Sequence, residues 1–339
     1  MKIDGPLLAT SLTDIPAAAR AQQQAGYDGL FTFDGPVEPF LPLALAAEHT
    51  RCDLMTGVAV ALARTPMVVA QLAHALALTS DGRFLLGLGS QIRPHIERRF
   101  SMPADRPVSR MKDFVRALRA IFACWNQDAP LRYEGEFYRH TMMPPLMKPL
   151  PCPHGAPPIL LAGVGEPMLR AAGEVADGVI LHPFHSRRYL ETVALPAIAA
   201  GRAAAEHADG ASARGFTIAC QVLVVTGADD LEAETARAAV RHQLGFYGST
   251  PAYLPVLAAE GWAHLQPELR QLTRDGAWSR IGALVTDEMI DRFAIVGTPA
   301  QVGRELVSRY RDVAARVGIA TPLPLSSRCA RGIIEAAGR

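Results

Sequence analysis

The sequence predicts an α/β protein and, within that class, a (β/α)8 TIM barrel with insertions. Short, almost continuously apolar segments alternate with amphipathic helical segments, which is typical of a parallel sheet covered by helices on both faces. The alternation is repeated over nearly the whole chain and supplies enough strands for a closed barrel. The chain has 339 residues. Because such a barrel needs roughly 250 residues, about 90 must lie in insertions.

The predicted strands are bounded by glycine, proline or helix-capping residues. They cover residues 3–9, 27–34, 52–62, 157–167, 177–184, 216–227 and 291–299, and a further strand, the fourth in order, lies in the stretch 79–100 and ends at Gly89-Ser90-Gln91. Two of the following helices begin at Thr65-Pro66 and Thr298-Pro299, where threonine can cap the helix and proline fits the first turn. Gly57 interrupts the third strand, which indicates a bulge or the close approach of another group.

We expect residues 1–316 to form a single barrel domain, since the sequence shows no second core. Residues 126–155 and 245–288 are the predicted insertions, and the second one divides into short helices. Residues 317–339 have no evident partner strand and are predicted to form a C-terminal tail.

The composition is that of a soluble globular protein, with 49% hydrophobic residues, 20% charged residues and a formal net charge of +1. No acidic or basic block stands out, so we expect neither a nucleic-acid nor a membrane partner. The five cysteines are widely spaced and include no C-x-x-C pair, which favours reduced thiols in the cytoplasm. We expect no signal peptide, and no apolar run reaches the roughly 18 residues of a membrane span.

The stretch Gly87-Leu88-Gly89 raises the question of dinucleotide binding. A Rossmann fingerprint requires a third small residue where this chain has Ile92. Pro94 also disfavours a helical conformation at Arg93. We therefore interpret the stretch as the glycine-rich end of a strand.

In a (β/α)8 barrel, the active site forms at the C-terminal ends of the strands. Glycine and small apolar residues dominate these ends here, which suits a large flat ligand that the main chain can approach. Asp34, His182 and His185 are the titratable candidates, and their pattern does not predict a metal site. The two histidines either bond to the backbone or contact a ligand. The turn 163–165 precedes a helix and can bind phosphate through free N–H groups and the helix dipole.

Four stretches carry a family resemblance when they are taken in order. They are GYDGLFTFD (26–34), TGVAVALARTPMVVAQLAHALALTSDGRFLLGLGSQ (56–91), PPILLAGVGEPMLRAAGEVADGVILHP (157–183) and FAIVGTPAQVGREL (293–306). Together they resemble the bacterial-luciferase-like superfamily, in its coenzyme F420-dependent LLM-class branch. RPHIERRFSMPADRPVSRM and YEGEFYRHTMMPP look like one F420-dependent subgroup. The resemblance implies a homodimer that binds the deazaflavin in the C-terminal mouth of the barrel.

The resemblance also implies a role for particular residues. Asp34 corresponds to the acid beside the deazaflavin, and Gly57-Val58 to a non-prolyl cis peptide in a bulge behind the ring. The strand-four residues lie near the ring or its ribityl chain, and the turn 163–165 binds the phosphate. The implied cofactor-binding set is Asp34, Gly57, Val58, Ser90, Gln91, Gly163, Val164 and Gly165.

Two positions depart from the family pattern. Gly35 and Ile92 stand where sugar-phosphate dehydrogenases of this family carry a histidine and a glutamate, so their acid–base mechanism cannot be transferred. The substitutes that the sequence offers are Asp34, His182, His185, His95 and Glu97. A basic run either meets the acidic tail of F420 or forms a solvated helix face; it consists of Arg93, His95, Arg98 and Arg99.

These observations predict an F420-dependent oxidoreductase that transfers a hydride between the deazaflavin and an unidentified organic substrate. One alternative is an FMN-dependent luciferase-like monooxygenase. The other is a non-catalytic cofactor-binding or sensor protein. Aromatic and methionine side chains of the insertions form either an apolar lid or ordinary packing; they are Tyr133, Phe137, Tyr138, Met142, Met143, Phe246, Tyr247, Tyr253 and Trp262.

Overall fold

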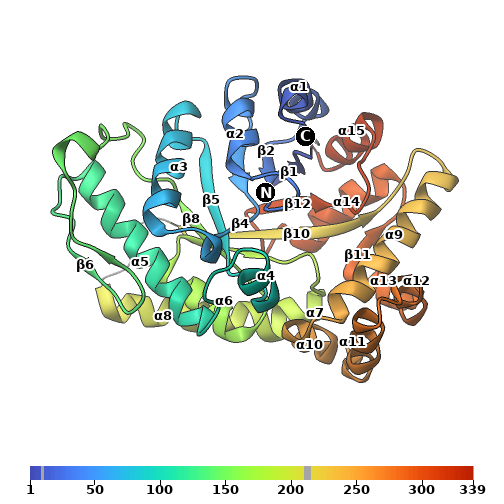
Figure 1. Cartoon of the computed structure of the whole chain (residues 1–339). Coiled ribbons are helices and arrows are strands. Elements are labelled where there is room, and N and C mark those ends of the chain that lie inside the picture. Colours follow the sequence, from blue (N-terminus) through green and yellow to red (C-terminus); the bar gives the residue numbers. More distant parts are fainter. Residues whose placement is uncertain (9–10, 210–214, 339) are drawn as a thin grey trace.

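A computed structural model describes residues 1–8, 11–209 and 215–338. Its parallel strands form a closed eight-stranded barrel with helices around the outside (Figure 1). In ring order the strands are β1 (Lys2–Pro6), β2 (Gly29–Thr32), β3 (Asp53–Thr56), β5 (Phe84–Gly89), β8 (Ile159–Gly163), β9 (Gly178–Leu181), β10 (Thr217–Val225) and β12 (Arg316–Ala320). The ring closes because β9 pairs with β10 and β12 pairs with β1. The predicted (β/α)8 barrel is confirmed.

The strand that completes the ring is not the predicted one. Segment 291–299 contains β11 (Ala294–Val296), which pairs with β10 at the side of the ring. The closing strand is β12, and α15 (Ser327–Ala336) follows it with Ile333 and Ile334 buried. The account of residues 317–339 as a tail without a partner strand is therefore wrong. Gly318 divides the apolar run of β12, which explains why the strand pattern is weak in the sequence. Ala9, at the end of the predicted first strand, lies outside the described residues.

Helices follow every strand of the barrel. The helices are α1 (Ile15–Ala25), α2 (Phe40–Ala47), α3 (Pro66–Thr79), α4 (Arg93–Arg98), α5 (Pro107–Asn126), α6 (Glu166–Val175), α7 (Arg187–Tyr189), α8 (Leu195–Asp209), α9 (Asp230–Gly248), α10 (Leu254–Ala259), α11 (Gln266–Arg274), α12 (Trp278–Ile281), α13 (Asp287–Phe293), α14 (Pro299–Tyr310) and α15. Against expectation, α4 begins directly at Arg93. Pro94 is tolerated because the first helical turn needs no N–H donor from it.

The interior of the barrel is filled, so only its C-terminal end can hold a ligand. Five buried side chains meet at the centre; they are Phe31, Met55, Leu160, Ile180 and Ala219. At the N-terminal end, Arg316 pairs with Asp4 at 2.6 Å and with Asp53 at 2.6 Å. This ion-pair network fills the N-terminal end of the barrel.

The two insertions take different positions. Residues 126–155 contain a hairpin of β6 (Tyr133–Glu134) and β7 (Arg139–His140) that packs on the outside of α5. There Asp113 accepts hydrogen bonds from the Tyr133 hydroxyl and, at 2.7 Å, from the Phe137 N–H. Residues 245–288 form the end of α9 and the short helices α10 to α12, as predicted. The first insertion is therefore a support for α5.

Within the described ranges, no helix is both long enough and apolar enough to cross a bilayer. All five cysteines are buried free thiols.

Candidate functional site

The predicted cofactor residues follow four strands that are neighbours in the ring. β2 leads into Asp34, β3 into Gly57-Val58, β5 into Ser90-Gln91 and β8 into the turn 163–165. Since β2, β3, β5 and β8 are consecutive, the structure brings these residues to one half of the C-terminal mouth. The ends of β9, β10, β12 and β1 form the other half.

The third strand is broken at the predicted position. β3 ends at Thr56, a short strand β4 (Ala59–Val60) follows, and the peptide bond Gly57-Val58 between them is cis. The Gly57 N–H donates to the Thr32 carbonyl at 2.6 Å. β4 pairs with β5, the strand that also neighbours β3 in the ring. The bulge and its cis peptide, which the family resemblance implies, are thus confirmed as structural features.

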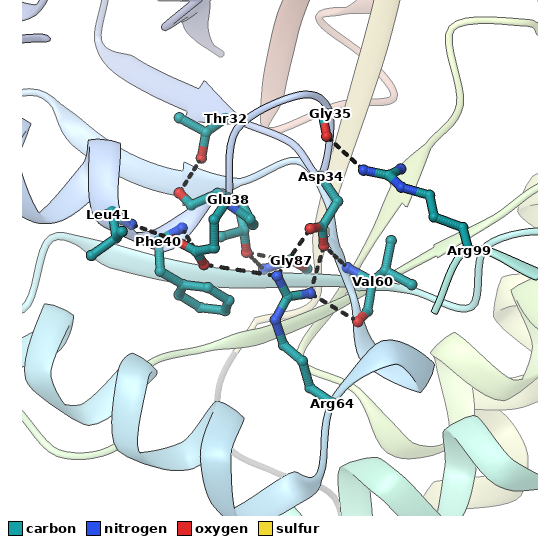
Figure 2. A network of polar contacts seen from close by, with 12 residues as sticks. Thr32, Asp34, Gly35, Glu38, Phe40, Leu41, Val60, Arg64, Gly87 and Arg99 are labelled. Carbon is teal, nitrogen blue, oxygen red and sulfur yellow. Dashed lines mark hydrogen bonds and ion pairs between the residues drawn. The ribbon is translucent and has the colours of Figure 1, made fainter. Parts of the chain in front are cut away.

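Asp34 holds the bulge in place through its carboxylate and its main chain, and Figure 2 shows the contacts of the carboxylate with Arg64 and Val60. One carboxylate oxygen accepts from Arg64 at 2.6 Å and from the Val60 N–H at 2.5 Å, and the other accepts from Arg64 at 2.9 Å. The Asp34 N–H donates to the Val58 carbonyl at 3.1 Å. Both ends of the segment 58–60 are therefore hydrogen-bonded to Asp34 at the end of β2. Arg64 and the Asp34 carboxylate form a bidentate pair, which is typical of strong arginine–carboxylate interactions.

This clamp changes the interpretation of Asp34. The side chain is 7% exposed and both of its oxygens are engaged, so the geometry makes it a positioning residue for the bulge rather than a free proton carrier. Sequence reasoning missed Arg64. The available signal was that Arg64 is the only charged residue between Asp53 and Asp81. A lone charge in so apolar a stretch indicates a buried partner.

Contacts around the clamp fix the loop after β2. The Glu38 carboxylate accepts from the N–H groups of Phe40 and Leu41, at 3.0 and 2.8 Å, and so caps α2. Arg99 donates to the Gly35 carbonyl at 2.7 Å (Figure 2). One member of the predicted basic run therefore has a local structural contact.

The remaining basic residues lie on the exposed helix α4. Arg93 pairs with Glu97 at 2.7 Å. His95 and Arg98 are exposed, and no side-chain hydrogen bond or ion pair of either is found within the described part of the chain. Contact with an acidic ligand tail therefore stays a prediction for these two residues.

The two glycines of β5 are explained by close packing inside the protein. A Cβ atom on Gly87 would lie 1.9 Å from the Thr56 carbonyl oxygen, and one on Gly89 would lie 2.7 Å from Val58. Both glycines thus make room for the broken third strand. Ser90 is half-buried beyond them, and Gln91 is exposed, with its side chain accepting from the Ile92 N–H at 2.9 Å.

The turn after β8 leaves main chain accessible. A Cβ atom on Gly165 would meet only Pro167, at 3.8 Å, and no side chain of the described residues caps the start of α6. Glu166 in the first turn is paired with Arg170 at 2.9 Å, which reduces its repulsion of an anion. Free N–H groups at a helix N-terminus favour a phosphate.

The two candidate histidines follow β9 and differ in accessibility. His185 is buried and satisfied on both nitrogens: Nδ1 donates to the His182 carbonyl at 2.7 Å, and Nε2 accepts from the Tyr310 hydroxyl at 3.0 Å. His182 is half-buried, and its Nδ1 accepts from the Phe184 N–H at 3.1 Å. Its proton is therefore on Nε2. Burial, and secondarily the neighbouring His185, lower the pKa of His182 to about 3, so the ring is neutral at pH 7.

Comparison with known proteins identifies the family. The profile of the luciferase-like monooxygenase family matches residues 2–316. The chain belongs to this family. An uncharacterised protein of Mycobacterium tuberculosis is 45% identical over 338 residues, covering 99% of this chain and 96% of the relative. A putative coenzyme F420-dependent oxidoreductase of the same species is 26% identical, over 84% of each chain.

Solved structures agree with this luciferase-like barrel. The coenzyme F420-dependent tetrahydromethanopterin reductase of Methanopyrus kandleri superposes with a TM-score of 0.78 at 19% identity, over 98% of this chain and 96% of that one. At this identity the similarity shows the fold. The resemblance drawn from the sequence is confirmed, and family membership supports an oxidoreductase.

Within the luciferase-like barrel, the second insertion contributes an aromatic rim to the mouth. The rings of Tyr247 and Tyr253 lie 4.5 and 4.7 Å from the His182 ring. Trp262 packs instead on Phe293. Of the candidate lid residues, the two tyrosines therefore border the site at His182, whereas Tyr133 and Phe137 of the first insertion contact α5.

The three candidate catalytic residues differ in whether their side chains are available to a ligand. Asp34 is engaged by Arg64, and His185 is buried with both nitrogens bonded, so neither is free to exchange a proton with a ligand. His182 keeps a hydrogen on Nε2 at the edge of the mouth. It is the candidate whose geometry allows contact with a substrate.

Proposed function

We propose that this chain is an F420-dependent oxidoreductase that transfers a hydride between C5 of the deazaflavin and an organic substrate. The observation that carries the proposal is the half of the mouth built by β2, β3, β5 and β8. Glycine and other small residues are frequent at these strand ends, and the carboxylate of this half, Asp34, is already neutralised by Arg64. Such a site can position a ligand but offers little acid–base chemistry, so the redox chemistry must come from a cofactor. The relative named as a putative F420-dependent oxidoreductase supports F420 in that role.

The residues present fit a large planar cofactor with a phosphate. Gly57 and Val58 would support the ring, Ser90 and Gln91 would adjoin the ring or its side chain, and the turn 163–165 would hold the phosphate. When bound, F420 supplies or accepts a hydride at C5. The protein orients the ring through the clamped bulge and excludes water with the rings of Tyr247 and Tyr253. His182, neutral and protonated on Nε2, can donate a hydrogen bond to an oxygen of the substrate.

The proposal is tested by titrating the purified protein with F420, FMN and NADPH while absorbance and fluorescence are recorded. We expect F420 to bind and to exchange a hydride with a member of a broad substrate panel. Binding of FMN with consumption of O2 would instead indicate a monooxygenase. Binding of F420 without turnover would indicate a non-catalytic role.

A pair of glycine variants tests the phosphate position. Gly165→Val adds a side chain beside the turn, where the backbone has ordinary φ and open space. We expect its affinity for F420 to fall about tenfold, which corresponds to 1.4 kcal/mol. Gly215→Val is the matched control, because Gly215 also has open space but lies in front of β10, away from the mouth. Equal affinities in the two variants would contradict the assignment.

We also propose that the chain forms a cytoplasmic homodimer through α2 and α3. These neighbouring helices carry no charged residue, yet they expose Leu41, Leu45, Val68 and Leu78. A helix that is apolar all round is normally covered, and an uncharged apolar face is complementary to a second copy of itself. Sedimentation of the wild type should give a dimer, and Leu45→Glu should give a monomer. A wild-type monomer at micromolar concentration would contradict this proposal.

A further inference from the structure

One buried side chain at the mouth has hydrogen-bonding groups that the protein does not use. Gln221, in the middle of β10, is 5% exposed. Its amide nitrogen and its amide oxygen are both buried without a hydrogen-bond partner in the described structure. Leaving a buried polar group unpaired costs about 1–3 kcal/mol, and native proteins rarely keep such a group without a reason.

The amide points into the barrel near its C-terminal end. Ala219 belongs to the cluster inside the barrel, and because side chains alternate along a strand, Gln221 faces the same interior two residues nearer the mouth. Gln221 is paired in register with Gly318 of β12. A Cβ atom on Gly318 would lie 2.4 Å from the amide oxygen and 2.6 Å from the amide nitrogen. The amide therefore packs against Gly318, where the Cβ atom of any other residue would collide with it.

The amide lies beside His182 at the end of β9. The last paired residues of β9 and β10 are Leu181 and Cys220, so His182 and Gln221 follow this pair side by side on adjacent strands. The clamped bulge at Gly57-Val58 belongs to the other half of the mouth. A planar ligand supported by the bulge thus has the amide and the His182 Nε2–H on its far side.

We infer that Gln221 recognises a ligand through an imide or lactam edge, in which an N–H and a C=O lie next to each other. A glutamine amide has an acceptor oxygen and a donor nitrogen, so it can accept from the N–H and donate to the C=O of such an edge. This inference rests on the proposed function for the position of the ligand. Two sources share the chemistry: the pyrimidinedione ring of the cofactor and an imide or lactam group of the substrate.

The first measurement is the thermal stability of the protein without ligand. Gln221→Leu and Gln221→Met remove the unpaired amide and should leave the melting temperature unchanged or raise it by a few degrees. Gln266→Leu is the matched control, because Gln266 is also buried but donates to the Ser249 carbonyl at 3.3 Å. This control should lower the melting temperature. If both Gln221 variants lose as much as the control, Gln221 is a structural residue and the inference is wrong.

The second measurement is binding, by calorimetry, of F420, FMN, uracil and succinimide to the wild type and the Gln221 variants. A loss of about tenfold or more, equivalent to 1.4 kcal/mol, in cofactor affinity assigns the edge to the cofactor. Unchanged cofactor affinity with lost binding of uracil or succinimide assigns it to the substrate. Unchanged binding of every ligand, or no binding of any to the wild type, overturns the inference. A wild type that binds uracil or succinimide but neither cofactor refutes the proposed function and leaves the inference standing.

Discussion

The two ends of the barrel differ in whether their buried polar groups have partners. At the lower end, which is the N-terminal end of the strands, Asp4 and Asp53 share Arg316, and Lys2 completes the network. At the upper end, which is the C-terminal end, the amide of Gln221 and the hydroxyls of Thr226 and Thr321 are buried without partners in the described structure. All three belong to, or directly follow, β10 and β12.

This contrast separates stability from function within one fold. A buried network in which every group is paired holds strands together, since breaking it leaves an unpaired charge. A buried group without a partner weakens the fold, and in native proteins a ligand, an ion or an ordered water usually completes it. The upper end also contains a paired region, the Asp34–Arg64 clamp. One half of the mouth is therefore fixed by this ion pair, and the other half contains the buried polar groups without partners.

The largest expected effect comes from breaking the lower network. Arg316→Met leaves Asp4 and Asp53 without their shared partner inside the barrel and should reduce the free energy of unfolding by about 3–5 kcal/mol. Urea denaturation measures this change. Lys2→Met is the control, because Lys2 is half-exposed and should change the same quantity by less than about 1 kcal/mol. Similar losses in both variants would remove the special role of Arg316.

A somewhat smaller effect is expected at the clamp. Arg64→Met leaves the Asp34 carboxylate without its charge partner, and we expect a loss of about 3 kcal/mol in the free energy of unfolding, together with weaker cofactor binding. The double variant Asp34→Asn, Arg64→Met should regain part of the stability, because the unpaired charge is gone. Glu38→Gln, whose carboxylate lies 3.8 Å from Arg64, is the control. No recovery in the double variant would show that the ion pair is not the cause.

The third prediction uses the titration of His182. Its folded pKa of about 3 lies below the ordinary value near 6.5, so the unfolded chain binds the proton more readily. The contribution of His182 is therefore fully present above pH 6.5 and is lost as the pH falls. Between pH 7 and pH 5 the loss amounts to up to about 2 kcal/mol.

The measurement for His182 is the unfolding free energy at pH 7 and pH 5. Burial also lowers the pKa of His185 to about 4, so His185 contributes a similar loss over this range. His182→Gln should therefore reduce the dependence by about 2 kcal/mol and leave the share of His185, and His95→Gln, at an exposed position, should leave it unchanged. A His182→Gln protein with the wild-type slope would show that His182 does not contribute to the dependence.

The smallest effect on stability is expected on α4. Replacing the exposed His95 and Arg98 by alanine should change the unfolding free energy by less than about 0.5 kcal/mol. If these side chains meet the acidic tail of F420, the affinity for F420 and its salt dependence should both fall, because fewer charges pair. Fluorescence titration at two salt concentrations decides this, with FMN, which lacks such a tail, as the reference ligand. An unchanged F420 affinity would make α4 a solvated face.

The sequence was sufficient for the architecture and for the break in the third strand. Apolar runs separated by helix caps predicted the barrel, and the glycine at position 57 predicted the break in β3. These signals are local, because they depend on spacing within a strand or a helix. They failed for β12, where Gly318 divides a short apolar run and only pairing with β1 and β10 defines the strand.

The family resemblance supplied a candidate cofactor-binding set, which stays a prediction, but it could not assign the hydrogen-bond and charge partners of those residues. Asp34 became a clamp residue because Arg64, 30 positions away, reaches it. His185 is not available as a catalytic residue because Tyr310, 125 positions away, forms a hydrogen bond with its ring.

By itself, the sequence determined that eight strand–helix units would form a barrel with small residues at one end. It could do so because periodicity and capping are properties of neighbouring residues. Only the tertiary structure decided which segment closes the ring, which charges are paired and which amide stays unsatisfied. Those outcomes depend on contacts between residues that are distant in the chain, and the closed ring brings such residues together.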